Sequence, residues 1–242
     1  KLNRILEEKP LPEPTAPKKP QGASVEFQNV TFCYPGTENP ALDHVSFSVP
    51  EGGTVALVGP SGGGKTTAAS LIPRFWDVQK GSVLIGGVDV REIAKEELMQ
   101  RVAFVFQDTK LFKKSLYENI RTSCPDAARE QVLAAAHAAQ CDDILQKMPD
   151  GIDTVVGTKG VYLSGGEAQR IALARAILKD APIIVLDEAT AARDKLGTDQ
   201  VGSDEWERLT ALINSASMQL DAYSTKLRNV KDNSKVLAPR DV

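Results

Sequence analysis

An eight-residue string in the first third of the chain combines glycines with a lysine and a hydroxyl side chain. Its residues are Gly59, Pro60, Ser61, Gly62, Gly63, Gly64, Lys65 and Thr66, and Thr67 follows directly. The spacing fits G-x-x-x-x-G-K-[ST], a pattern whose backbone N–H groups surround phosphates. Glycines are needed because a Cβ atom would block the close approach that wrapping a phosphate requires. The string therefore predicts a nucleotide-phosphate loop, with Lys65 reaching the β- and γ-phosphates and the Thr66 hydroxyl binding Mg²⁺.

Two elements must flank such a loop, a strand before it and a helix after it. Residues 54–58 form an apolar run, and we expect a strand there that is buried on both faces. Residues 66–72 are expected to form the helix, whose N-terminal dipole favours a phosphate. The alternative is a glycine-rich turn that contains Lys-Thr by chance, and these flanks disfavour it.

Two carboxylates follow a second apolar run. Residues 183–186 read Ile-Ile-Val-Leu and are followed by Asp187 and Glu188. The C-terminal end of such a strand is where open α/β sheets bind ligands. We expect Asp187 to hold Mg²⁺ and Glu188, next to but not on the metal, to act as the general base toward water. Taken alone, the pair also fits acidic caps after a buried strand.

The remaining apolar patterns predict an α/β fold. Alternating positions over residues 25–34 and 45–49 predict antiparallel strands. Further strands are expected at residues 83–85 and 102–106, and helices at residues 127–140 and from Gly165 onward. We therefore expect an α/β domain with a mostly parallel central sheet.

Composition excludes several classes of protein. The 242 residues are 42% hydrophobic and 25% charged, as in a packed soluble domain. The 29 basic and 32 acidic residues give a net charge of −3, so no global positive field attracts nucleic acid. No apolar run exceeds five residues, which is too short to cross a bilayer. The three scattered cysteines indicate reduced thiols in a cytosol.

A third string, Leu163-Ser164-Gly165-Gly166-Glu167, opens an expected helix. Ser164, with Glu167 three residues later, predicts a capping box. Capping alone does not call for two glycines in the first turn, because each costs up to about 1 kcal/mol of helix stability. A phosphate that approaches the N–H groups of this helix end explains the glycines better.

This string resembles the LSGGQ signature of ABC-type ATPases, with Glu167 in place of the usual Gln. The resemblance covers residues 23–194 and includes the phosphate loop and the acidic pair. It implies a P-loop NTPase fold with an antiparallel β subdomain and a helical subdomain that carries the signature. It also implies ATP and Mg²⁺ as cofactors, Tyr34 as the aromatic that stacks on adenine, Thr67 as a further nucleotide-binding residue, and Gln107 as a contact to Mg²⁺ and water.

Within this family, the sequence looks most like the nucleotide-binding domains of exporters whose membrane helices are on the same chain. Residues 1–22 hold five prolines and are expected to form a semi-rigid linker from a preceding membrane domain. The resemblance implies two partners, that membrane domain and a second nucleotide-binding domain in a head-to-tail dimer, and no nucleic acid. Ser164 and Gly166 of one subunit then close on the γ-phosphate held by Lys65 of the other, with Gly165 and Glu167 also at the nucleotide. The resemblance also implies that the chain lies at the cytoplasmic face of the cell membrane.

The resemblance ends after residues 191–194, the position of the D-loop. Both histidines, His44 and His137, precede the signature, so the switch histidine of the family is missing. Residues 195–242 form an unrecognised tail, for which we expect an amphipathic helix over residues 204–227. The tail is either foreign sequence joined to a truncated domain, which we favour because the change is abrupt, or a divergent end that has lost the switch. Losing the distal strands is expected to lower the stability of the domain.

Two functions therefore remain open from the sequence. The first is an ATP-hydrolysing motor of a membrane exporter. The second is a module that binds ATP with little turnover, because the switch histidine and the distal strands are missing. A soluble ABC ATPase of DNA repair or translation predicts a basic groove or a large insertion, and the sequence has neither.

Overall fold

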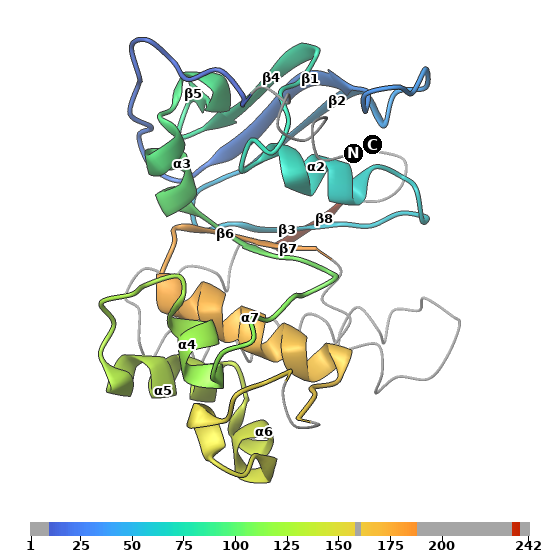
Figure 1. Ribbon diagram of the computed structural model, residues 1–242. Helices are drawn as coiled ribbons and strands as arrows, with labels where there is room; N and C mark the ends of the chain where they lie inside the picture. Colours follow the sequence, from blue (N-terminus) through green and yellow to red (C-terminus); the bar gives the residue numbers. More distant parts are fainter. Residues whose placement is uncertain (1–9, 158–160, 188–233, 238–242) are drawn as a thin grey trace. The chain divides into compact units, whose positions relative to one another are not determined.

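The computed structural model describes residues 10–157, 161–187 and 234–237, and the chain divides into two compact units (Figure 1). Residues 1–101 and 235–242 form the first unit, and residues 102–234 form the second. The first unit contains β1 (Val25–Phe32), β2 (Leu42–Val49), β3 (Thr54–Leu57), α2 (Lys65–Leu71), β4 (Lys80–Ile85), β5 (Val88–Asp89), η1 (Val90–Glu92) and α3 (Lys95–Arg101). The predicted helix after the glycine-rich string thus begins one residue earlier than expected.

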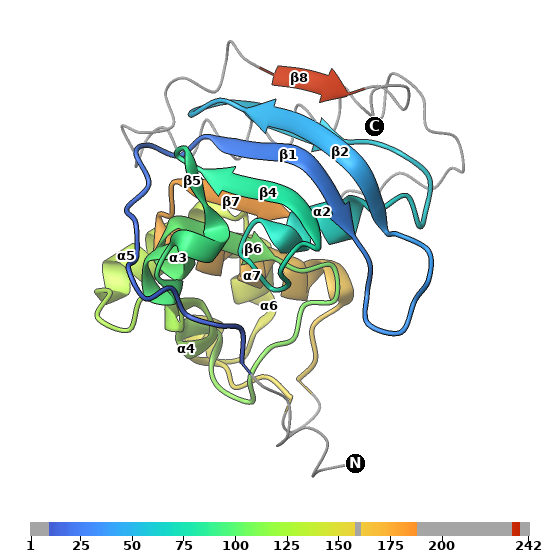
Figure 2. The same cartoon turned by 90° about the horizontal axis from the view of Figure 1, so that it is seen from above.

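The first unit is built on a four-stranded antiparallel sheet in the order β2-β1-β4-β5 (Figure 2). The alternation of apolar residues along β1 is interrupted where its pairing with β2 is irregular. Phe27 pairs with Phe47, but Val30, three residues later in β1, pairs with Val45, only two residues away in β2. Asn29 adopts a left-handed φ of 50° at this irregularity. The extra residue turns Val30 inward again, and its side chain is fully buried. The sheet confirms the predicted antiparallel subdomain.

The strand before the glycine-rich string differs from the prediction. We expected burial on both faces, but all four residues of β3 are only half-buried. In the part of the chain that the structure describes, β3 pairs with one strand, β8 (Ser234–Leu237). One strand neighbour leaves more of β3 uncovered than the centre of a wide sheet would. No strand was predicted for the segment that forms β8.

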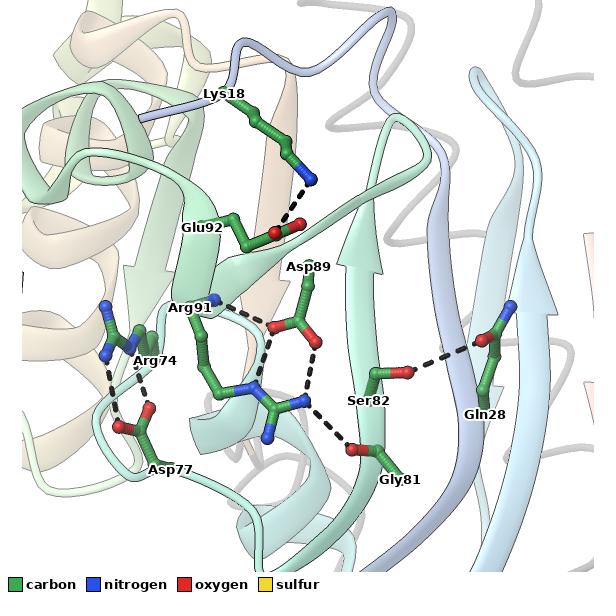
Figure 3. Close-up of polar contacts among 9 residues, drawn as sticks. All are labelled: Lys18, Gln28, Arg74, Asp77, Gly81, Ser82, Asp89, Arg91 and Glu92. Carbon is green, nitrogen blue, oxygen red and sulfur yellow. Dashed lines mark hydrogen bonds and ion pairs between the residues drawn. The ribbon is translucent and has the colours of Figure 1, made fainter. Parts of the chain in front are cut away.

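Residues 12–22 run along the first unit and hydrogen-bond to it. The Lys18 N–H donates to the Glu92 carbonyl at 2.8 Å, and the Lys18 ammonium pairs with the Glu92 carboxylate at 2.7 Å (Figure 3). The Gln21 N–H donates to the Gly86 carbonyl at 3.0 Å. The proline-rich segment is therefore held on the unit by backbone hydrogen bonds and an ion pair.

Arg74 connects this segment to the region just after α2. Its Nε and Nη2 donate to the two carboxylate oxygens of Asp77 at 2.7 and 3.0 Å (Figure 3), and Nη2 also donates to the Pro12 carbonyl at 2.9 Å. The hydrogen bond that Arg74 donates to Asp77 is the largest cause that raises the pKa of Arg74, so the guanidinium stays charged although its side chain is only 7% exposed. The end of the helix behind the loop is thus tied to the N-terminal segment.

The second unit joins two parallel strands to a group of helices. Its elements are β6 (Val102–Val105), α4 (Leu116–Arg121), α5 (Arg129–Ala138), α6 (Asp142–Lys147), η2 (Gly151–Asp153), α7 (Gly165–Lys179) and β7 (Ile183–Leu186). β6 and β7 pair in parallel, which agrees with the predicted α/β fold. One side of α7 packs on β6 through small residues, Ala172 and Ala176. Its apolar residue Ile171 lies in the core shared with α4 and α5.

Three predictions concern residues outside the described part of the chain. They are the general base Glu188, the D-loop at residues 191–194 and the amphipathic helix at residues 204–227. All three cysteines are described, and all three are free thiols, as the sequence predicts.

Candidate functional site

The glycine-rich string forms a loop between β3 and α2. β3 ends at Leu57, α2 begins at Lys65, and Gly64 is the N-cap residue with φ +80°. Gly62 has φ +81°, and a Cβ atom added there would meet nothing within 4 Å. The loop is exposed to solvent over residues 60–63. Left-handed glycines in an open loop before a helix N-terminus give the backbone that surrounds phosphates.

Lys65 lies back over this loop. Its Nζ donates to the carbonyl oxygens of Gly59 at 2.9 Å and Pro60 at 2.8 Å. These two hydrogen bonds keep the ammonium beside the loop backbone. A phosphate bound by the loop N–H groups would therefore find a positive charge within reach, and hydrogen bonds between charged groups are about twice as strong as neutral ones.

Gly64 leaves no room for a side chain. An added Cβ atom would lie 2.5 Å from the Ala41 carbonyl oxygen and 2.7 Å from Leu42 Cδ2. Because the backbone is also left-handed, we expect Gly64→Ala to lower the free energy of unfolding by about 2 kcal/mol or more. Gly62→Ala has the same backbone strain but no close neighbour, and should lose only about 1 kcal/mol. Urea unfolding measures both variants, and equal losses would contradict the steric explanation.

Tyr34 lies beside the helix that follows the loop. Its hydroxyl and Thr67 Oγ1 are 3.1 Å apart, and Thr67 is only 6% exposed. The ring of Tyr34 makes edge contacts with Phe32, at a centroid distance of 4.9 Å, and with Trp76, at 5.6 Å. The expected adenine-binding aromatic and the phosphate loop thus belong to the same unit and are joined through α2.

Asp187 and Gln107 follow the two parallel strands of the second unit. Val105 ends β6 and pairs with Leu186, the last residue of β7. The Asp187 N–H donates to the Val105 carbonyl at 3.0 Å, which continues the pairing by one residue, and Gln107 follows Val105 by two. Both residues therefore come from the carboxyl edge of the strand pair, where α/β sheets bind ligands. Asp187 is 8% exposed, whereas Gln107 is exposed.

The third string begins α7 with the predicted capping box. Ser164 Oγ accepts from the Glu167 N–H at 3.3 Å, and the Glu167 carboxylate accepts from the Ser164 N–H and hydroxyl, both at 2.9 Å. The bond from the Ser164 backbone is the largest cause that holds the pKa of Glu167 below its usual value. Next to the cap, a Cβ atom on Gly165 would meet nothing within 4 Å. The helix end is thus capped, with open space beside its first glycine.

The structure places the predicted residues in two groups. Tyr34, the phosphate loop and Thr67 lie in the first unit, and Gln107, Asp187 and the signature lie in the second. Sequence reasoning missed Trp76 and Gln79, which contact the ring of Tyr34 and the backbone just before it. No motif marks either residue, because both contacts join the two residues after β1 to a segment more than forty residues later.

Each unit, taken by itself, offers groups that fit part of the chemistry of ATP and Mg²⁺. The first unit offers a glycine backbone and an ammonium for phosphates, and an exposed Thr66 at the start of α2. Oxygen atoms, the ligands that Mg²⁺ prefers, are provided by Thr66 in the first unit and by Gln107 and Asp187 in the second. A bound Mg²⁺ would neutralise part of the phosphate charge.

These features define the class, a P-loop nucleotide-binding domain with a helical subdomain. The family model described as ABC transporter matches residues 42–191, so the chain belongs to the ABC transporter family. This confirms the resemblance and the fold class that the sequence predicts, and it assigns the chain an ABC-type ATPase domain.

Named relatives agree with the exporter type. The chain is 50% identical over 172 residues to the ATP-dependent lipid A-core flippase of Methylobacillus flagellatus, covering 71% of this chain and 30% of the flippase. The flippase of Escherichia coli (strain K12) is 50% identical over 171 residues, which are 70% of this chain and 29% of that protein. The chain thus spans about three tenths of the length of these relatives.

A solved structure is similar over nearly the whole chain. A bacterial Atm1-family ABC exporter with ATP bound superimposes with a TM-score of 0.76 at 33% identity, covering 98% of this chain and 38% of the exporter chain. Within the described residues, no helix combines the length and the hydropathy needed to cross a membrane.

Proposed function

We propose that this chain binds and hydrolyses ATP to drive export through an ABC transporter, as its nucleotide-binding domain on the cytoplasmic face of the cell membrane. The observation that carries the proposal is the loop between β3 and α2, where Lys65 lies at the carbonyls of Gly59 and Pro60 and Tyr34 is joined to the same helix. The flippase relatives are named as ATP-dependent, and the similar exporter structure contains ATP, which supports the same reading.

Each residue has a proposed role. Lys65 and the loop backbone bind the β- and γ-phosphates, and Tyr34 stacks on the adenine. Thr66, Gln107 and Asp187 hold Mg²⁺. Glu188 accepts a proton from the attacking water, a role that suits a carboxylate beside the metal site.

The partners in this proposal are a membrane domain and a second nucleotide-binding domain. Ser164 and Gly166 of one subunit close on the γ-phosphate bound by the other, with Gly165 and Glu167 also at the nucleotide, so each site needs both copies. Support comes from the start of α7, where Ser164 and Gly165 are exposed and the space beside Gly165 is open. N–H groups at a helix N-terminus favour an anion there.

The dimer is tested by light scattering on the Glu188→Gln variant, in which bound ATP is expected to persist. With Mg²⁺ and ATP, its mass should rise from 26.1 kDa to twice that value. Adding Gly165→Asp should prevent the rise, because it places a negative charge at the proposed phosphate contact. Its Cβ meets no neighbour within 4 Å, so the fold should tolerate it.

Ala128→Asp is the matched control for this experiment. Ala128 is exposed and is the N-cap of α5, another helix of the same unit, where aspartate is favourable. This variant should still dimerise with ATP. A dimer that forms equally well with Gly165→Asp would contradict the head-to-tail arrangement.

A further inference from the structure

The segment between α2 and β4 surrounds Tyr34 in a way that no motif requires. It contributes Trp76, which contacts the ring of Tyr34, and Gln79, which hydrogen-bonds to the backbone of Cys33. All of these residues lie in the first unit. The arrangement bears on how the ring of Tyr34 is oriented.

Gln79 holds the backbone next to Tyr34 with both ends of its amide. Its Oε1 accepts from the Cys33 N–H at 2.8 Å, and its Nε2 donates to the Cys33 carbonyl at 3.0 Å. The Gln79 N–H also donates to the Thr31 carbonyl at 3.3 Å. Among side chains of this length, an amide is the one that accepts and donates at the same time. The side-chain amide of Gln79 therefore bonds to Cys33, the residue after β1, in the way that the backbone of a neighbouring strand would.

The other side of Tyr34 is fixed by its own turn. The Thr37 N–H and hydroxyl both donate to the Tyr34 carbonyl, at 3.1 and 2.8 Å. The ring is then limited by the edge contact with Trp76 and by the Thr67 hydroxyl, 3.1 Å from the phenol oxygen. Backbone and ring are thus held from separate directions.

We propose that Gln79 is a positioning residue that sets Tyr34 for binding the nucleotide base. This rests on the proposed function, in which Tyr34 stacks on adenine. A stacking contact depends on the position and plane of the ring, and a shift of the backbone at Cys33 and Tyr34 would move the Cβ atom from which the ring projects. Gln79 hydrogen-bonds to the backbone of Cys33 and Thr31, so we expect it to affect binding of the base and not of the phosphates.

The test compares the affinity of the full chain for ATP with its affinity for inorganic tripolyphosphate, which has the three phosphates and no base. Gln79→Glu replaces the amide donor by a carboxylate oxygen facing the Cys33 carbonyl, and Gln79→Met removes both hydrogen bonds without adding charge. Each variant should weaken ATP binding by about three- to tenfold, the scale expected for losing two exposed hydrogen bonds. Tripolyphosphate affinity should not change, which also shows that the loop is folded.

Gln28→Glu is the matched control, since Gln28 is an exposed glutamine of the same unit, on β1. It hydrogen-bonds to Ser82 (Figure 3) and to Glu26. It should leave both affinities as they are. Equal weakening of ATP and tripolyphosphate by the Gln79 variants, or no weakening of either, would overturn the inference.

Tyr34→Ala separates this inference from the function on which it rests. It should weaken ATP at least as much as the Gln79 variants do, with tripolyphosphate unchanged. If Tyr34→Ala leaves ATP affinity intact, the base-binding role of Tyr34 is wrong. In that case a selective loss in the Gln79 variants would also overturn the positioning role, because Gln79 would be acting by another route.

Discussion

Replacing Lys65 with alanine should abolish measurable ATP binding, with a loss of affinity of about 100-fold or more. Lys65 Nζ is held at 2.9 and 2.8 Å from the carbonyls of Gly59 and Pro60, so its charge is already located at the loop before a ligand arrives. Removing it takes away the charge-assisted contacts to the phosphates, and a 100-fold loss corresponds to about 2.7 kcal/mol. Titration with a fluorescent ATP analogue or calorimetry measures the change.

The fold should survive this substitution, because the two carbonyls that lose the ammonium lie in a solvent-accessible part of the loop and can bond to water. Lys80→Ala is the control, since Lys80 is an exposed lysine on β4 of the same unit. It should bind ATP normally. Unchanged ATP affinity in Lys65→Ala would remove the loop from the nucleotide site.

Asp187→Asn should lower Mg²⁺-dependent phosphate release by about 100-fold or more, because metal-ion stabilisation of the transition state is worth several kcal/mol. The side chain is 8% exposed at the end of β7, and asparagine has nearly the same shape. The Asp187 N–H to the Val105 carbonyl is a backbone bond and remains. The substitution therefore removes the charge that attracts the cation with little change in packing.

The measurement is the rate of phosphate release over a range of Mg²⁺ concentrations. The variant should need more Mg²⁺ for half-maximal rate as well as losing maximal rate. Asp180→Asn is the control, because Asp180 is exposed at the end of α7 with φ 50°, a conformation that asparagine tolerates. Its rates should match those of the unsubstituted chain. An Asp187→Asn variant with the original Mg²⁺ dependence would contradict the metal role.

Local signals account for what the sequence predicted well. The loop between β3 and α2 was predictable because its glycines mark a break between two regular elements. Gly62 and Gly64 take left-handed dihedral angles that other residues resist. The capping box at the start of α7 follows from the hydroxyl of Ser164 and a carboxylate three residues later. Strand β7 matches the predicted run Ile183–Leu186, since a run of four apolar residues has the length of a strand and is too short for a typical helix.

Contacts between distant segments were not predictable. The pairing of Gln79 with Cys33 spans 46 residues, and that of Arg74 with Pro12 spans 62. The sequence around a polar residue in a loop does not indicate which distant residue it will bond to. The burial of β3 was overestimated because an apolar run shows that a strand can be covered, whereas coverage depends on its neighbours.

We propose that this chain turns over ATP with Glu188 as the base. Steady-state phosphate release by the unsubstituted chain, compared with Glu188→Gln under the same Mg²⁺ and ATP, tests it most directly. We expect Mg²⁺-dependent release well above background, reduced about 100-fold or more in Glu188→Gln, in line with the contribution of a general base. Equal rates near background in both proteins would contradict it and leave a domain that binds ATP without turnover.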